Sequence, residues 1–257
     1  MRPLLLRGFY WGTIAALLLP LALVVGMSFK DGPIVSFPLG KLSGRWYFAL
    51  LDDLDAQHAV LTSVAVAVCS TGLAVAIGVW SALALDAVTS RAWRLALLFG
   101  AMVPMVTPGI IHAIALRIFI RDIGLDPGWL AVTLGHAVHA TPYVVILITA
   151  RLASMPPGFV EGARILGASP FQCLRDIVLP WLSPALLGAG VLALLTSFDD
   201  FVRSFFLGGY QATLPVLIYG RLHGGFTPEL SAISTLVLLV AGLAGIFSAI
   251  GSKSTGH

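Results

Sequence analysis

Six long apolar segments divide the sequence, and they restrict the fold more than any other feature. They cover approximately residues 9–28, 58–85, 95–119, 129–150, 183–207 and 230–251. Each is long enough to cross about 30 Å of hydrocarbon as a helix. None shows the alternating pattern of membrane barrel strands, and in lipid every backbone polar group must be hydrogen-bonded internally. The sequence therefore predicts an all-α membrane protein with six transmembrane helices.

The composition supports the same fold class. Of the 257 residues, 58% are hydrophobic and only 11% are charged, whereas soluble proteins average about 25% charged residues. No shift in composition marks a linker, so residues 1–257 are predicted to form a single transmembrane domain in a lipid bilayer. The net charge of +3 is spread along the chain and indicates no nucleic-acid-binding surface.

The first apolar segment is interpreted as a retained transmembrane helix. Arg2 and Arg7 precede it, as in a secretory signal peptide. However, the segment is about as long as a span requires, and no small-x-small cleavage site follows it. With the N-terminus in the cytosol, Lys and Arg are divided almost equally between the two sides, so the charge rule favours this orientation only slightly.

Small residues and prolines predict close packing and a bend. Gly, Ala and Ser crowd the second segment, and small side chains let membrane helices approach closely. Pro104 and Pro108 interrupt the third segment, and each removes a backbone donor. The third segment is therefore expected to bend, either to line a pathway or as irregular packing. Cys69 and Cys173 lie in different regions and indicate neither a disulfide nor a metal site.

The connection between the fourth and fifth segments, residues 154–180, carries local signals for two short helices. Pro156 and Pro157 suit the start of the first helix, and Gly167 suits the position after its end. The sequence Ser-Pro-Phe-Gln at 169–172 predicts a capping box at the start of the second helix. Leu-Pro at 179–180 is expected to end that helix before the fifth span begins at Ser-Pro 183–184.

The same connection resembles the EAA motif of ABC import permeases: Glu-Ala-Ala, three residues, Gly, nine residues, then Ile-x-Leu-Pro. At that spacing the sequence has Glu161, Gly162, Ala163, Gly167, Ile177, Leu179 and Pro180. The one departure is Gly162, which costs about 1 kcal/mol of helix stability relative to alanine. In that family the loop is a cytosolic coupling helix seated in the ATPase subunit. The resemblance therefore implies the fold of a type I ABC importer permease with both termini in the cytosol.

The resemblance also implies partners. The chain has no G-x-x-x-x-G-K-[ST] phosphate-binding motif, so we expect a transport subunit and no enzyme activity, cofactor or metal in this chain. ATP and Mg would be bound by two copies of a separate ABC subunit. A second permease, expected to be a distinct chain, and an extracytoplasmic substrate-binding protein would complete the importer.

A cluster at the end of the fifth segment provides the candidate substrate pathway: Phe198, Asp199, Asp200 and Phe201. Adjacent carboxylates beside an apolar run require water, a cation or a partner. Arg203 lies four residues after Asp199 and is placed to pair with it on a helix. Alternatively, the carboxylates and the aromatic faces, which attract ammonium groups, form a cation site.

This cluster resembles the Ser-[Phe/Leu]-Asp-Asp-Phe segment of the spermidine/putrescine permease subfamily. The resemblance implies import of polyamines or a related organic cation. An aminophosphonate, an opine or an amino-acid-like solute remains an alternative within the same class of permease.

Three histidines fall within the predicted spans: His112, His136 and His139. Histidine in a span suggests a proton relay or a metal site. His136 and His139 have the i, i+3 spacing of one helix face, but no third ligand is evident beside that pair. We therefore expect the histidines to be hydrogen-bonded packing residues. Two other classes of protein stay open on the sequence alone. One is a secondary carrier or channel, which the coupling loop disfavours, and the other is a membrane metalloenzyme built on these histidines.

Overall fold

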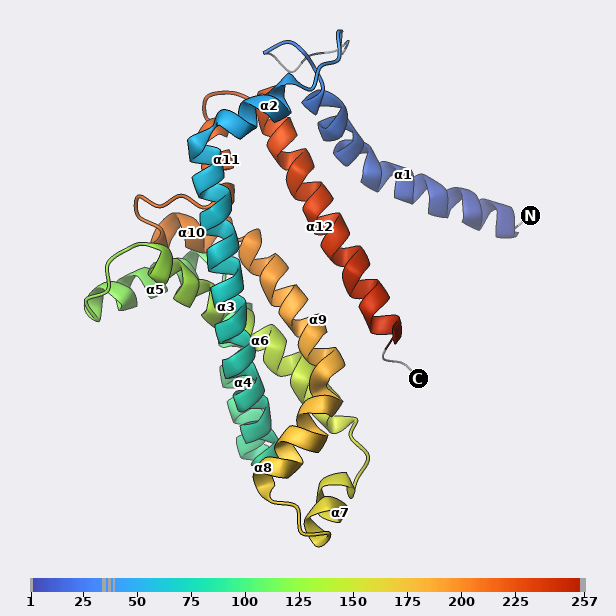
Figure 1. Ribbon diagram of the computed structural model, residues 1–257, viewed down its shortest axis with the longest axis vertical. Helices are drawn as coiled ribbons and strands as arrows, with labels where there is room; N and C mark the ends of the chain where they lie inside the picture. Colours follow the sequence, from blue (N-terminus) through green and yellow to red (C-terminus); the bar gives the residue numbers. More distant parts are fainter. Residues whose placement is uncertain (1, 34–35, 37, 39, 255–257) are drawn as a thin grey trace. The chain divides into compact units, whose positions relative to one another are not determined.

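The computed structural model describes residues 2–254, apart from 34, 35, 37 and 39, and its described residues form helices and no β-strand (Figure 1). The helices are α1 (Arg2–Ser28), α2 (Arg45–Asp52), α3 (Leu54–Ala87), α4 (Arg91–Val106), α5 (Gly109–Asp122), α6 (Trp129–Ala153), α7 (Phe159–Ile165), α8 (Pro170–Cys173), α9 (Leu179–Phe198), α10 (Phe201–Leu207), α11 (Leu214–Leu222) and α12 (Pro228–Ser254). A π-helical turn, Leu174–Val178, joins α8 to α9. The all-α prediction is confirmed.

The chain divides into two compact units, and each is described by itself: Met1–His58 with Leu217–Leu243, and Ala59–Val216 with Ala244–His257. In the first unit, hydrogen bonds fix the segment after α1 to α2. The Ser28 hydroxyl lies 2.7 Å from the Tyr47 hydroxyl, and Trp46 Nε1 donates to the carbonyl of Lys30 at 2.8 Å. The interpretation of residues 1–257 as a single domain stays a prediction.

Within the part of the chain that the structure describes, four helical stretches are long and apolar enough to span a membrane, and the bent pair α4–α5 counts as a fifth. The four are Leu6–Ser28, Leu54–Ala87, Trp129–Ala153 and Pro170–Phe198. They contain all or most of the first, second, fourth and fifth predicted segments. The sixth predicted segment, 230–251, lies within α12.

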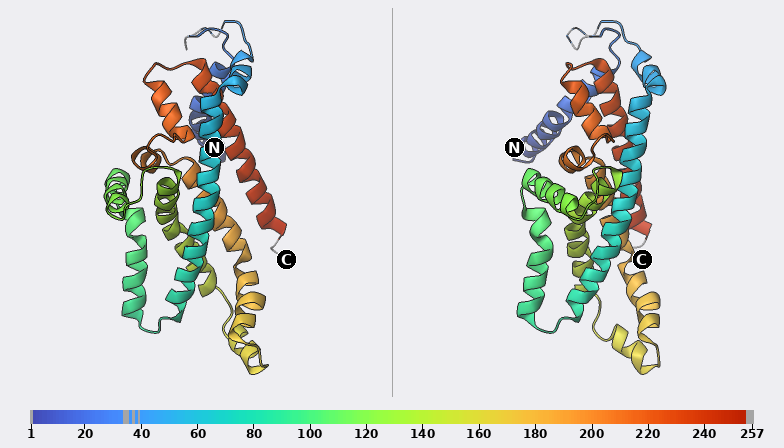
Figure 2. Two further views of the ribbon diagram at one scale, coloured as in Figure 1. Left: turned by 60° about the vertical axis from the view of Figure 1, so that its left-hand side comes forward. Right: turned by 90° about the vertical axis from the view of Figure 1, so that its left-hand side faces the viewer.

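The expected bend in the third segment falls between α4 and α5, which meet at 102° (Figure 2). Pro104 is accommodated inside α4, whereas Thr107 is extended, with φ −67° and ψ 132°. The residue before a proline is disfavoured in the helical region, because the proline ring crowds its backbone. Pro108 therefore ends α4 and starts α5 in a new direction.

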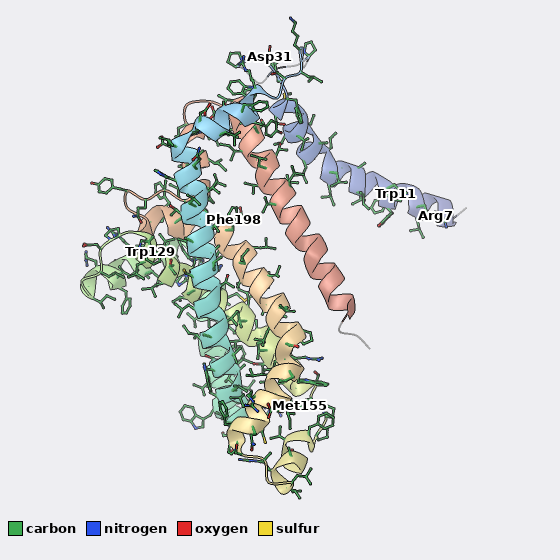
Figure 3. The ribbon with its side chains drawn as sticks, in the orientation of Figure 1. Arg7, Trp11, Asp31, Trp129, Met155 and Phe198 are labelled. Atoms are coloured by element: carbon green, nitrogen blue, oxygen red, sulfur yellow. The ribbon has the colours of Figure 1, made fainter. Side chains whose placement is uncertain are left out.

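The core of the second unit forms where α3, α6 and α9 meet. Its buried side chains are Ala74, Ala82, Ala140, Val144, Ile148, Leu182, Ala189 and Ala193. The many alanines let the helices lie close, as the small-residue pattern indicates. The helices α3 and α6 lie close together at Gly78, where an added Cβ would lie 2.5 Å from a methyl group of Val144. Trp129 and Met155 mark opposite ends of α6, and Phe198 marks the end of α9 nearer Trp129 (Figure 3).

The prediction that Leu179-Pro180 ends a helix is wrong. The helix runs from α8 through the π turn into α9, with Pro180 in the first turn of α9. In the π turn the Leu179 amide donates to the carbonyl of Leu174, five residues back. A proline ring normally crowds the carbonyl four residues earlier. The wider π turn relieves this crowding, so the chain continues without a break.

We expect Gly78→Ala to destabilise the protein by about 1–3 kcal/mol, because overpacking forces side chains or backbone to shift. Thermal unfolding of the purified protein in detergent measures the effect. Gly72→Ala is the matched control on the same helix, since nothing lies within 4 Å of its added Cβ. Equal melting temperatures for the two variants would contradict the close packing of α3 on α6.

Candidate coupling loop and buried polar site

The first helix of the loop, α7, begins at Phe159, two residues after the paired prolines. Gly158 precedes it with φ +90°, in the left-handed region, and the Gly162 amide donates to the Gly158 carbonyl at 2.8 Å. The prolines therefore lie outside the helix. Glycine supplies the turn into it, because other residues rarely adopt this conformation.

The end of α7 matches the prediction from Gly167, which has φ +92°. The Gly167 amide donates to the carbonyl of Arg164, and the Ala168 amide donates to that of Ala163, both at 3.0 Å. This pair of bonds is a Schellman motif, which satisfies the last carbonyls of the helix.

The start of α8 shows the predicted capping box. Ser169 Oγ accepts from the Gln172 amide at 3.3 Å, and Gln172 Oε1 accepts from the Ser169 amide at 2.7 Å. Two helix signals read from the sequence, the glycine end and the capping box, are thus confirmed, and together they fold the connection into a compact pair of short helices.

Most of the predicted coupling residues lie around two adjacent hollows. A groove of about 840 Å³ is lined by Gly162, Ala163, Ile177 and Pro180 among others. A neighbouring hollow of about 390 Å³ is lined by Ala163, Gly167 and Ile177. Glu161 and Leu179 are exposed beside them. Residues from the two ends of the motif, which are far apart in the sequence, thus lie on one continuous surface.

The tip of this surface exposes apolar side chains. Ile165 and Leu166 are 85% and 90% exposed, and Phe171 is also exposed. The loop lies at one end of the second unit, beyond the ends of α6 and α9 (Figure 1). Adjoining exposed apolar side chains are typical of a surface that is covered by another protein.

The two adjacent aspartates occupy different environments. The fifth predicted segment is broken here, because α9 ends at Phe198 and α10 begins at Phe201. Asp200 is buried and caps α10: its Oδ1 accepts from the Arg203 amide at 3.1 Å, and its Oδ2 pairs with the Arg203 guanidinium. Asp199 is exposed. The Asp199–Arg203 pair, one of the two alternatives for this cluster, is wrong, because it assumed an unbroken helix.

His136 connects this ion pair to three serines. Its Nδ1 lies 2.7 Å from Ser197 Oγ, and its Nε2 lies 3.1 Å from Ser204 Oγ. Ser70 Oγ donates to Ser197 Oγ at 2.9 Å, and His136 Nε2 is 3.9 Å from Asp200 Oδ2. The polar groups of α3, α6, α9 and α10 therefore satisfy one another in the apolar interior, where unpaired polar groups are costly.

The other two histidines lie beside Arg203. Arg203 Nε donates to His112 Nδ1 at 3.3 Å, and the rings of His112 and His139 are 6.2 Å apart. The guanidinium repels a cation at this position. Among the residues that the structure describes, no three His, Cys, Asp or Glu side chains are placed to hold a metal ion.

The first unit contains an ion cluster that the sequence analysis missed. Arg221 lies 2.6 Å from both Asp53 and Glu229. The hydrogen bond from Arg221 holds the pKa of Asp53 below its usual value. The cluster joins the chain before α3 to α11 and α12. No sequence signal marks it, because Asp53 is far from its partners along the chain.

The fold defines a polytopic helical membrane protein with a structured loop at residues 154–180 and a buried polar site at a helix break. Residues 74–252 match the family of binding-protein-dependent transport system inner membrane components. Because this match covers more than half of the chain, the chain belongs to that family, and it is a transport subunit of the inner membrane. The ABC permease fold inferred from the EAA-like motif is confirmed.

Two relatives cover most of the chain. The putrescine transport system permease protein PotI of Escherichia coli K12 is 31% identical over 236 residues, which are 89% of this chain and 84% of that protein. The spermidine/putrescine transport system permease protein PotC of the same strain is 31% identical over 241 residues, 93% of this chain and 90% of that protein.

A solved structure supports the fold. A bacterial ABC transporter involved in the import of the acidic polysaccharide alginate has a chain that superposes with a TM-score of 0.77. The match covers 100% of this chain and 97% of that chain, at 19% identity. At this identity the likeness concerns the fold and not the transported solute.

We expect Asp200→Asn to destabilise the permease by about 3–5 kcal/mol, because it leaves the Arg203 guanidinium buried without a counter-charge. The double variant Asp200→Asn with Arg203→Gln removes both charges and should recover most of this loss. Thermal unfolding in detergent measures all variants, with Asp199→Asn as an exposed control expected within about 0.5 kcal/mol of the wild type. Equal losses for Asp199→Asn and Asp200→Asn would contradict the different environments of the two carboxylates.

Proposed function

We propose that this chain is the permease subunit of an ATP-driven importer of polyamines, and that a separate ATPase drives it through residues 154–180. The observation that carries the coupling proposal is the groove lined by Gly162, Ala163, Ile177 and Pro180 beside an exposed apolar tip. The observation that carries the substrate proposal is the similarity to permeases named for putrescine and spermidine.

The coupling proposal assigns the loop to the cytosol. Ile165 and Leu166 are exposed at its tip, and their burial in a cleft of the ATPase would provide the apolar part of the contact. Glu161, exposed on α7, would add a polar contact at the edge. With the loop in the cytosol, both termini are cytosolic as well.

The proposed complex contains further subunits. Two copies of the ABC subunit would bind ATP and Mg, a second and distinct permease would form the other half of the pathway, and a binding protein would deliver the substrate. The family description, which names transport systems that depend on a binding protein, supports the last of these.

We propose Asp199 as the carboxylate that attracts the ammonium groups of the substrate. The charge of Asp200 is balanced by Arg203, so the exposed Asp199 supplies the net negative charge at the helix break. Phe198 and Phe201 flank the two aspartates, and aromatic faces attract ammonium groups. A cationic solute is therefore favoured over an anionic or neutral one at this position.

The glycine at the end of α7 provides a test of coupling. We expect Gly167→Ala to weaken association with the ATPase, because its φ of +92° disfavours any residue with a Cβ by about 1–2 kcal/mol. Glu161→Lys should also reduce association, by reversing the charge on the exposed face of α7. Co-purification of the ATPase with the tagged permease measures both variants.

Gly162→Ala is the matched control on the same helix. Its added Cβ meets nothing within 4 Å, and alanine favours a helix by about 1 kcal/mol over glycine. ATPase recovery should therefore equal or exceed that of the wild type. Normal recovery and normal uptake in both Gly167→Ala and Glu161→Lys would refute the coupling assignment.

Asp199→Asn tests the cation pathway. We expect the KM for putrescine or spermidine uptake to rise roughly tenfold, which corresponds to about 1.4 kcal/mol and is reasonable for one charge near a protein surface. Uptake of radiolabelled substrate by cells or proteoliposomes measures it. Asp86→Asn, an exposed carboxylate on α3, is the control and should leave KM unchanged. An unaltered KM in Asp199→Asn would remove this residue from the pathway.

A further inference from the structure

The end of α6 and the beginning of α9 are joined by a reciprocal contact outside the coupling motif. Arg151 Nε donates to the carbonyl oxygen of Trp181 at 3.0 Å, and Trp181 Nε1 donates to the carbonyl oxygen of Arg151 at 3.1 Å. The guanidinium carbon lies 4.2 Å from the centre of the indole ring. Each side chain thus bonds the backbone of the other residue, while the two planes are in cation–π contact.

The geometry of this contact resists relative motion of the two helices. Sliding or rotating α6 against α9 would lengthen both hydrogen bonds and move the guanidinium away from the indole ring at the same time. Neither side chain is exposed, so solvent competes with these bonds less than it would at an open surface. The ends of α6 and α9 are therefore expected to move as a single body.

The contact lies beside the coupling loop. Arg151 and Trp181 line the same groove as Gly162, Ala163 and Ile177. Phe159, the first residue of α7, meets the Trp181 ring edge to face, with centroids 6.5 Å apart. Trp181 therefore touches the helix that the ATPase is proposed to move, and its partner Arg151 belongs to α6.

The same two helices lead to the buried polar site. His136 on α6 and Ser197 on α9 are 2.7 Å apart, and α9 ends immediately before Asp199. A displacement shared by α6 and α9 would reach the helix break without first disrupting these hydrogen bonds.

We propose that Arg151 and Trp181 are positioning residues that pass movement of the coupling helix to α6 and α9 together. This proposal rests on the proposed coupling function. It adds a side-chain contact that links α7 to both helices that bear the polar site, beside the continuous helix that joins α8 to α9.

The test uses the complete importer, with its ATPase, second permease and binding protein, reconstituted in proteoliposomes. Trp181→Phe keeps an aromatic ring and removes the indole donor, and Arg151→Lys keeps the charge and removes the planar guanidinium. Putrescine uptake and ATP hydrolysis are measured in the same vesicles. We expect substrate transported per ATP to fall by roughly twofold to thirtyfold, the range found for residues between coupled sites, while the ATPase still co-purifies.

Matched controls are available on α4. Trp93 is 68% exposed and Arg94 lies in an exposed ion pair with Asp86, so Trp93→Phe and Arg94→Lys make the same chemical changes away from the groove. Both should keep the wild-type ratio. The variant carrying both Trp181→Phe and Arg151→Lys should lose no more coupling than the stronger single variant, because the two residues act as one unit.

Three results would overturn the proposal. One is an unchanged ratio of transport to hydrolysis in both single variants. Another is an equal proportional loss of uptake and hydrolysis together with a lowered melting temperature, which would indicate a purely structural contact. The last is wild-type protein that shows no ATP-dependent uptake, because the proposed function itself then fails whatever Arg151 and Trp181 do.

Discussion

A helix can be interrupted inside an apolar environment only where protein groups form hydrogen bonds with the freed backbone atoms. Any charged side chain that forms such a bond must itself be paired with an opposite charge. The break between α9 and α10 meets this condition through Asp200, which bonds both the backbone amide and the guanidinium of Arg203. Both ring nitrogens of His136 are hydrogen-bonded beside this pair, to the hydroxyls of Ser197 and Ser204. The charges of Asp200 and Arg203 balance each other in the interior. The neighbouring Asp199 is exposed and adds a negative charge at the helix break.

The features that the sequence predicted correctly depend on local chemistry. Gly167 ends α7, and Ser169 starts α8 with a capping box, because caps are determined by residues within one turn. Two errors arose where tertiary packing or an irregular turn prevailed, and a third concerns Pro156 and Pro157, which lie outside α7. Pro180 continues a helix that a π turn makes wide enough for it, and Arg203 pairs with Asp200 because the helix breaks before it. Contacts between distant residues, such as Arg151 with Trp181, leave no local pattern in the sequence.

The helix α9 connects the two candidate sites of the second unit. Trp181 lies in its first turn beside the coupling loop, and Ser197 lies in its last turn beside the polar site. At 1.5 Å per residue these positions are roughly 24 Å apart. Since α6 packs along α9 and carries Arg151 and His136, the pair contacts both regions. A displacement at one end of this pair therefore has a direct mechanical route to the other.

The π turn at Leu174–Val178 has a consequence for deletions in this chain. A π turn accommodates one residue more than an α-helical turn, whereas each residue added to an α-helix rotates the remainder of that helix by about 100°. Deleting a single residue here would let an ordinary helix form with the direction of Trp181 kept, because the π turn absorbs one extra residue. That ordinary helix would bring the ring of Pro180 into conflict with the carbonyl of the preceding turn. The extra residue of this segment is therefore what accommodates a proline in the first turn of α9, so that substitutions within the segment are tolerable in a way that loss of a residue is not.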